Sequence, residues 1–179
     1  MSEIFKGVRP LDYVLTALLS VAGLLLMYQN TVSTEATAHA VSTTSWAIVP
    51  SFLLVTLPIL FRRRGILPVI AVTAVTTLGH VLAFGWLTRC GVAVPLVFAL
   101  AYAVARFGGV LRNQLIGLAG VVVIQLVMLA RDASIDTVLS GLALTIPGTA
   151  LFYGIGLVVQ NRVTKRSTGV ALADQRQAA

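Results

Sequence analysis

The sequence predicts an all-α protein, a polytopic membrane bundle of six transmembrane helices with both termini on the cytoplasmic side. Its composition is the first observation behind this prediction. Hydrophobic residues make up 58% of the 179 residues and charged residues only 11%, whereas soluble domains are about half apolar and about a quarter charged. Six acidic and thirteen basic residues are too few to cover the surface of a soluble fold of this length, so the composition favours a membrane protein.

Six apolar runs are the second observation. They cover residues 11–28, 46–61, 66–87, 91–105, 114–130 and 138–159. A bilayer core about 30 Å thick requires about 20 helical residues, so the short second and fourth runs need flanking residues or local thinning of the bilayer. Strands of a membrane barrel would alternate apolar and polar residues, whereas stretches such as "LLSVAGLLLM" are almost uniformly apolar. The runs are therefore predicted to be helices.

The distribution of basic residues is the third observation, and it predicts the orientation. Short cytoplasmic loops carry an excess of lysine and arginine. With the N-terminus inside, only Arg89 and Arg131 of the thirteen basic residues fall outside. The run Arg62-Arg63-Arg64 lies in the turn between the second and third helices, where it marks the cytoplasmic face. Binding of anionic lipid headgroups is a second role for these arginines that needs no further residues.

These observations divide the chain into a six-helix transmembrane domain at residues 1–160 and a basic cytoplasmic tail at residues 161–179. The lipid bilayer is the expected partner, and the expected location is the inner or plasma membrane, crossed several times. The net charge of +7 does not indicate nucleic-acid binding, because the basic residues lie between apolar runs rather than on one face of a polar fold.

Polar residues in the third helix form the main candidate site. His80 shares a helical face with Thr73, Thr76 and Thr77 at spacings of three, four and seven, and Gln125 on the fifth helix lies at a similar depth as a candidate partner. Ionisable groups inside a membrane are costly and indicate function. We consider two interpretations: His80 senses protons or a ligand, because imidazole titrates near neutral pH, or it is a structural hydrogen-bonding residue between helices.

A second cluster is expected in the exterior loops and consists of Glu35, His39, Asp132 and Asp136. Its acids lie on the side with few basic residues, so a cation or a basic peptide could be attracted there; ordinary solvation of the loops is the alternative. A metal site is not expected, because it needs three or four convergent ligands.

Other features give weaker expectations. Asp12, next to Arg9 at the start of the first helix, is expected to form an interfacial ion pair with it. Small residues at spacings of four on the fourth and sixth helices permit close helix contact, either within one chain or in a homodimer. The sequence contains no phosphate-binding loop, HExxH motif or Gly-x-Ser-x-Gly motif, so neither an enzyme nor a cofactor is expected.

Two stretches resemble a known family. Residues 8–26 ("VRPLDYVLTALLSVAGLLL") and residues 99–120 ("ALAYAVARFGGVLRNQLIGLAG") are similar to the N-terminal membrane domain of actinobacterial sensor histidine kinases. In that family an Arg-Pro-Leu-Asp entry precedes the first helix, and an Ala-Leu-Tyr-x-Val-Ala helix end is followed by arginines. The matching positions are Arg9, Pro10, Leu11 and Asp12, followed by Ala101, Tyr102, Val104, Ala105 and Arg106. The tail "NRVTKRSTGVALADQRQAA" resembles the basic helix that connects the membrane and catalytic domains of such kinases.

The resemblance implies a sensing and anchoring domain without catalytic activity. Such kinases continue into a phospho-accepting dimerisation helix and an ATP-binding domain, and neither is found in this sequence. In this interpretation the sixth helix passes a change in packing to a cytoplasmic signalling partner. Two alternatives remain: a small-molecule-binding membrane subunit of an importer, with a transport partner, and a small regulatory membrane protein.

Overall fold

The computed structural model describes residues 8–32, 45–84, 93–129 and 135–177. Every regular element in these residues is helical, as predicted. The elements are α1 (Pro10–Val32), α2 (Ile48–Thr56), the 3₁₀ helix η1 (Leu57–Phe61), α3 (Ile66–Phe84), α4 (Ala93–Phe107), α5 (Leu111–Leu129) and α6 (Ile135–Gln177). The six predicted runs therefore coincide with six helical segments, of which the second combines α2 and η1.

Local chemistry explains several helix boundaries. Pro10 occupies the first position of α1, where its missing N–H costs nothing. Pro58 lacks the N–H that would continue α2, and the chain tightens there into η1. At the end of α4, Gly109 adopts a φ of +66°, a left-handed conformation that glycine adopts readily after a helix.

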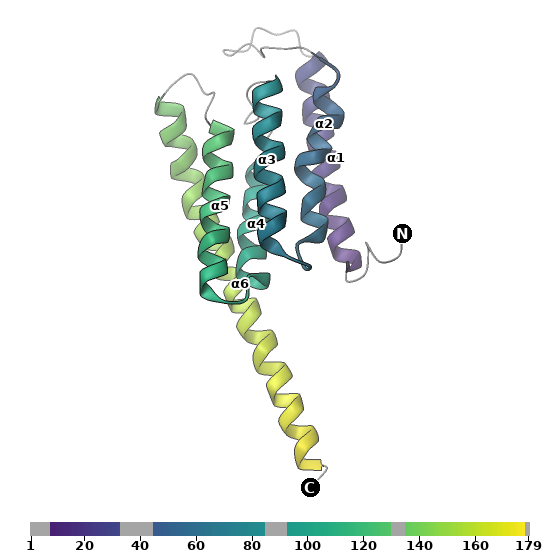
Figure 1. The fold of residues 1–179 in the computed structure, drawn as a ribbon, viewed down its shortest axis with the longest axis vertical. Helices are drawn as coiled ribbons and strands as arrows, with labels where there is room; N and C mark the ends of the chain where they lie inside the picture. The colour runs from purple at the N-terminus through teal and green to yellow at the C-terminus, as the bar shows by residue number, and fades with distance from the viewer. Residues whose placement is uncertain (1–7, 33–44, 85–92, 130–134, 178–179) are drawn as a thin grey trace.

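The helical segments run alternately up and down, with α2 and η1 together forming one of them (Figure 1). α1 packs on α2 and η1, α2 packs on α3, and α3 packs on α5, while α4 makes its most extensive contact with α6. The turns at residues 62–65 and 108–110 and the N-terminal end of α1 lie at one end of the bundle, which we call the basal end. Every described lysine and arginine lies at this end or on the part of α6 beyond it.

The interior is formed by branched and aromatic side chains, while large apolar side chains also cover the outside. Phe52, Val55, Leu100 and Ile124 are fully buried. Outward-facing residues such as Val75 remain mostly exposed, with 70% of that residue accessible. An exterior covered with large apolar residues is typical of a surface that contacts lipid or another protein.

Three helices are long and apolar enough to cross a membrane: Ile66–Phe84, Leu111–Leu129 and the Leu139–Arg166 part of α6. Three further apolar helical stretches are shorter, namely Pro10–Leu25, Ile48–Phe61 and Val94–Phe107. Length and composition thus support a membrane protein.

The 43-residue α6 is the largest difference from the expected element lengths. The boundary expected at residue 160 is not a break in the helix, and Pro147 lies within it. At 1.5 Å per residue the helix is about 65 Å long, about twice the thickness of a bilayer core. Its second half projects beyond the basal end of the bundle (Figure 1).

Candidate functional site

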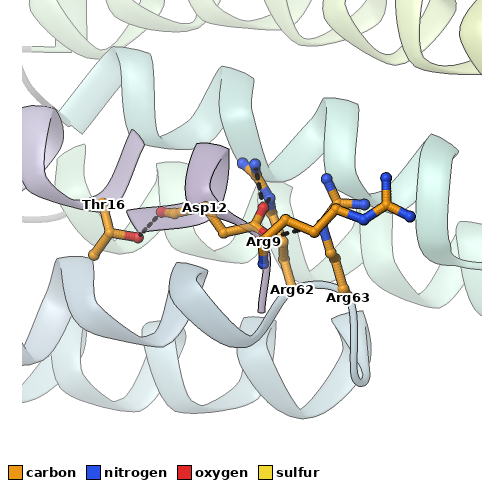
Figure 2. Close-up of polar contacts among 5 residues, drawn as sticks. All are labelled: Arg9, Asp12, Thr16, Arg62 and Arg63. Atoms are coloured by element: carbon orange, nitrogen blue, oxygen red, sulfur yellow. Dashed lines mark hydrogen bonds and ion pairs between the residues drawn. The ribbon is translucent and has the colours of Figure 1, made fainter. Parts of the chain in front are cut away.

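A buried ion-pair cluster joins the start of α1 to the turn after η1. Asp12 is 1% exposed and Arg62 is 8% exposed. Arg62 donates to Asp12 Oδ1 from Nε at 3.0 Å and from Nη2 at 2.7 Å, and Arg63 Nε donates to Oδ2 at 2.6 Å. Figure 2 shows the Asp12 carboxylate in contact with both arginines. Two of the three consecutive arginines therefore hold the first two helical segments together.

The expected side-chain pair between Asp12 and Arg9 is replaced by this arrangement. Arg9 contributes its backbone N–H, which donates to Asp12 Oδ2 at 2.9 Å. A carboxylate two residues after the first helical position commonly reaches back to the preceding backbone N–H in this way. The same carboxylate therefore caps α1 and binds the guanidinium groups from the next helical segment.

The cluster extends to the end of α4 through an aromatic ring. The Arg63 Cζ atom lies 5.1 Å and the Arg106 Cζ atom 5.8 Å from the centroid of the Phe107 ring, within the range of cation–π attraction. Arg106 also donates to Gln160 Oε1 on α6 at 2.7 Å. We call Asp12, Arg62, Arg63 and Arg106 the basal cluster; its three guanidinium groups and one carboxylate carry a net charge of +2.

Small polar residues on α1 continue the seam between α1 and α2 above the basal cluster. Thr16 donates to the Asp12 carbonyl at 2.8 Å, and the Ser20 and Thr56 hydroxyls are 2.8 Å apart. Gly23 follows, where an added Cβ atom would clash with the Phe52 ring. This seam was missed in the sequence, although Asp12, Thr16, Ser20 and Gly23 recur at spacings of three or four.

The predicted polar face of α3 is only partly correct. Thr73, Thr77 and His80 are buried. Thr76 is half-buried, and its hydroxyl donates to the carbonyls of Val72 and Thr73 within its own helix. Thr76 therefore lies at the edge of this polar face, where it lines an apolar groove on the outside of the bundle.

The proposed pairing of His80 with Gln125 is also wrong. The His80 ring lies between the rings of Phe52 and Phe84, with centroid distances of 5.9 and 5.1 Å, and its Nε2 is 3.4 Å from the Ile48 carbonyl. Gln125 instead donates from Nε2 to Thr149 Oγ1 at 2.6 Å. The two residues share a depth but face different neighbours, α2 for His80 and α6 for Gln125.

Several buried polar atoms on these residues have no hydrogen-bond partner within the described part of the chain. They are Thr73 Oγ1, Thr77 Oγ1, His80 Nδ1 and Gln125 Oε1. His80 is nevertheless 4% exposed and packed between two aromatic rings. Burial between aromatic rings of this kind is typical of a structural residue.

Two apolar grooves begin near the arginine run. The groove that we call the inner groove has a volume of about 560 Å³ and lies between α1, α4 and α6; Leu15, Leu19, Arg62, Phe98, Tyr102 and Ile155 are among its lining residues. The second groove, of about 460 Å³, is lined by residues of α2, η1 and α3 and includes Arg64 and Thr76. The arginine run therefore borders both grooves.

The expected exterior cluster lies outside the described part of the structure. Glu35, His39 and Asp132 lie outside the described residues, and the side chain of Asp136, in the first turn of α6, also lies outside them. Among the described residues, the basal cluster is thus the best-defined charged site, and the buried polar atoms of α3 and α5 do not belong to it.

Comparisons of the chain with protein-family models, with curated proteins and with solved structures found no match.

Proposed function

We propose that this chain is a membrane-embedded sensor and anchor domain of the histidine-kinase type, with six spans and both termini in the cytoplasm. The observation that carries the proposal is the continuity of α6. Its first half packs against α4, and the same helix then leaves the bundle at the basal end. A rotation or shift of this helix inside the bundle would move its projecting half as one body.

α4 and α6 pack so closely that a shift of one helix would change its contacts with the other. A Cβ atom added to Gly156 would lie 2.6 Å from Ala105 Cβ and 2.7 Å from the Tyr102 carbonyl oxygen. Gly148 meets the ring of Phe98 in the same way. Near the basal end, Tyr153 donates to Gln114 Oε1 at 2.6 Å, which ties α6 to α5 as well.

The distribution of charge supports the proposed orientation. The described basic residues gather at the basal end and on projecting α6, and cytoplasmic segments carry such an excess. At the opposite end, Tyr28 and Trp46 have ring centroids 6.0 Å apart and are about half or more exposed. Amphipathic aromatic rings are enriched at membrane interfaces.

A stimulus acts through such a domain only if it binds two helix arrangements with different affinities.

The proposed role of α6 is tested with a chimera in which residues 1–177 are joined to the dimerisation and ATP-binding domains of a characterised sensor kinase. Between zero and seven residues are inserted at the junction. Each inserted helical residue rotates the kinase by about 100°. Autophosphorylation in membranes should vary with this phase and return toward its starting value at seven residues.

A flexible four-glycine junction is the control, and it should abolish the dependence on phase. Autophosphorylation that depends neither on the helical phase nor on substitutions at Gly156 would contradict the proposal. If that result accompanies a small molecule that stays bound in native mass spectra, the importer subunit becomes the better interpretation.

A further inference from the structure

The inner groove combines an apolar wall with a buried charge at its basal end. Its wall is formed mainly by apolar side chains of α1, α4 and α6, and Arg62, from the turn after η1, is its charged lining residue. α1 packs on α2 and η1 rather than on α4, so the groove follows a seam between two parts of the bundle. Its volume of about 560 Å³ lies within the usual range of ligand-binding pockets.

Among the described side chains, the positive charge near this groove exceeds the negative charge. Asp12 is the only acid in the basal cluster, and it faces the guanidinium groups of Arg62 and Arg63. Arg106 follows the groove residue Tyr102 by four positions and therefore lies one turn closer to the basal end on the same face of α4. The two bonds to Asp12 use two of the five N–H groups of Arg62.

We propose that the inner groove is a binding site for one anionic phospholipid. An acyl chain lies along Leu19, Phe98 and Ile155, and the phosphate group accepts hydrogen bonds from Arg62 and Arg106. Basic pockets between membrane helices on the cytoplasmic side bind anionic headgroups. The inference rests on the membrane placement proposed above, but not on a role in signalling.

A second copy of the chain is a less suitable occupant of this groove. A symmetric dimer places the same surface of both subunits in contact, so two basal clusters, each with a net charge of +2, would come close together. Like charges across an interface are unfavourable, whereas an anionic headgroup would neutralise part of the cluster.

The test uses the full chain in membranes with equal amounts of phosphatidylglycerol and phosphatidylcholine that carry the same acyl chains. After gentle extraction, native mass spectrometry counts the lipids that stay bound. One arginine near an anionic lipid is worth about a fivefold preference, so retained phosphatidylglycerol should exceed phosphatidylcholine by at least about fivefold.

Two pairs of variants separate the acyl chain from the headgroup. Ala99→Leu fills the inner groove and should abolish the retained lipid, whereas Ala119→Leu, on the exposed face of α5, should leave it unchanged. Arg106→Gln should reduce the preference for phosphatidylglycerol several-fold, whereas Arg112→Gln, an exposed arginine outside the basal cluster, should preserve it. Arg62 is kept, because its loss would break both hydrogen bonds to Asp12 Oδ1.

Three results would overturn the lipid site: equal retention of both lipids, retention that Ala99→Leu does not change, or a lipid-free dimer. Each of these leaves the proposed sensor function intact if the chain remains in the membrane fraction after alkaline washing. Release of the chain by that wash would instead refute the membrane placement itself, and with it both proposals.

Discussion

Arg62 and Asp12, fifty residues apart in the sequence, are joined by two hydrogen bonds to a single carboxylate oxygen. This pair fixes the basal end of α1 against the turn after η1, and Arg63 binds the other oxygen of the same carboxylate. The arginine run is therefore part of the packing of the bundle as well as a charged surface.

Removal of the Asp12 charge should destabilise the protein strongly. Asp12→Asn leaves Arg62 buried without its counter-ion, and loss of one partner of a buried pair costs about 3 kcal/mol or more. Reversible unfolding in mixed micelles should show this decrease in the free energy of unfolding. Arg112→Gln, which changes an exposed arginine at the same end, should alter it by less than about 0.5 kcal/mol. Equal effects of the two substitutions would show that the ion pair contributes little.

Two glycines of α6 offer a matched test of the contact with α4. Gly156→Ala forces a Cβ atom against the Tyr102 carbonyl and should lower the free energy of unfolding by about 1–3 kcal/mol. Gly154→Ala meets no atom within 4 Å and should instead be neutral, or stabilising by up to about 1 kcal/mol. The same micelle unfolding assay distinguishes them. If Gly156→Ala left the free energy of unfolding unchanged, α6 would pack less closely on α4 than the structure indicates.

A structural role for His80 predicts that an aromatic replacement is tolerated. His80→Phe keeps a ring between Phe52 and Phe84 and removes Nδ1, which has no hydrogen-bond partner among the described residues, so stability should change by less than about 1.5 kcal/mol. His80→Ala opens a cavity and should cost about 3 kcal/mol. Any pH response of the kinase chimera should persist in the stable His80→Phe variant. Its selective loss there would favour proton sensing by the imidazole.

The contact between Gln125 and Thr149 should appear as an energetic coupling between α5 and α6. Their side chains are 2.6 Å apart and buried, and hydrogen bonds between membrane helices contribute about 0.6 to 1.7 kcal/mol. A double-mutant cycle with Gln125→Met and Thr149→Val should measure a coupling energy in this range. A cycle between Gln125 and His80, which make no hydrogen bond to each other, should give a value near zero. The reverse result would restore the pairing inferred from the sequence.

The helices could be predicted from the sequence because long apolar runs leave few alternatives in a membrane, where the backbone must satisfy its own hydrogen bonds. The partners of the polar residues could not be predicted in the same way. Position along a helix gives the depth of Gln125 and His80, but the direction of each side chain depends on how α3 and α5 rotate against their neighbours. The ion pair of Asp12 with Arg62 likewise depends on contact between segments that are distant in the sequence.

The lengths of the helices were less predictable where the backbone properties of proline or glycine opposed the pattern of apolar residues. Pro58 converts the end of the second run into η1, although the run itself looks continuous. In the tail, polar residues and Gly169 give the chain little intrinsic preference for a helix, yet α6 extends to Gln177. A preceding helix removes the cost of nucleation, so the tail needs only to propagate a helix that packing in the bundle has already formed.

The proposed orientation predicts which cysteines a membrane-impermeant thiol reagent can reach in intact cells. Cys90, the only native cysteine, is placed outside by the sequence, and it lies beyond the described residues. It should react with the reagent without permeabilisation, and the Cys90→Ser variant should not be labelled. In the Cys90→Ser background, Arg112→Cys at the exposed start of α5 should react only after permeabilisation, because the basal end carries the described basic residues and should face the cytoplasm. The opposite pattern would invert the topology, and the basal cluster would then face the exterior, where it could not contact a cytoplasmic lipid leaflet or signalling partner.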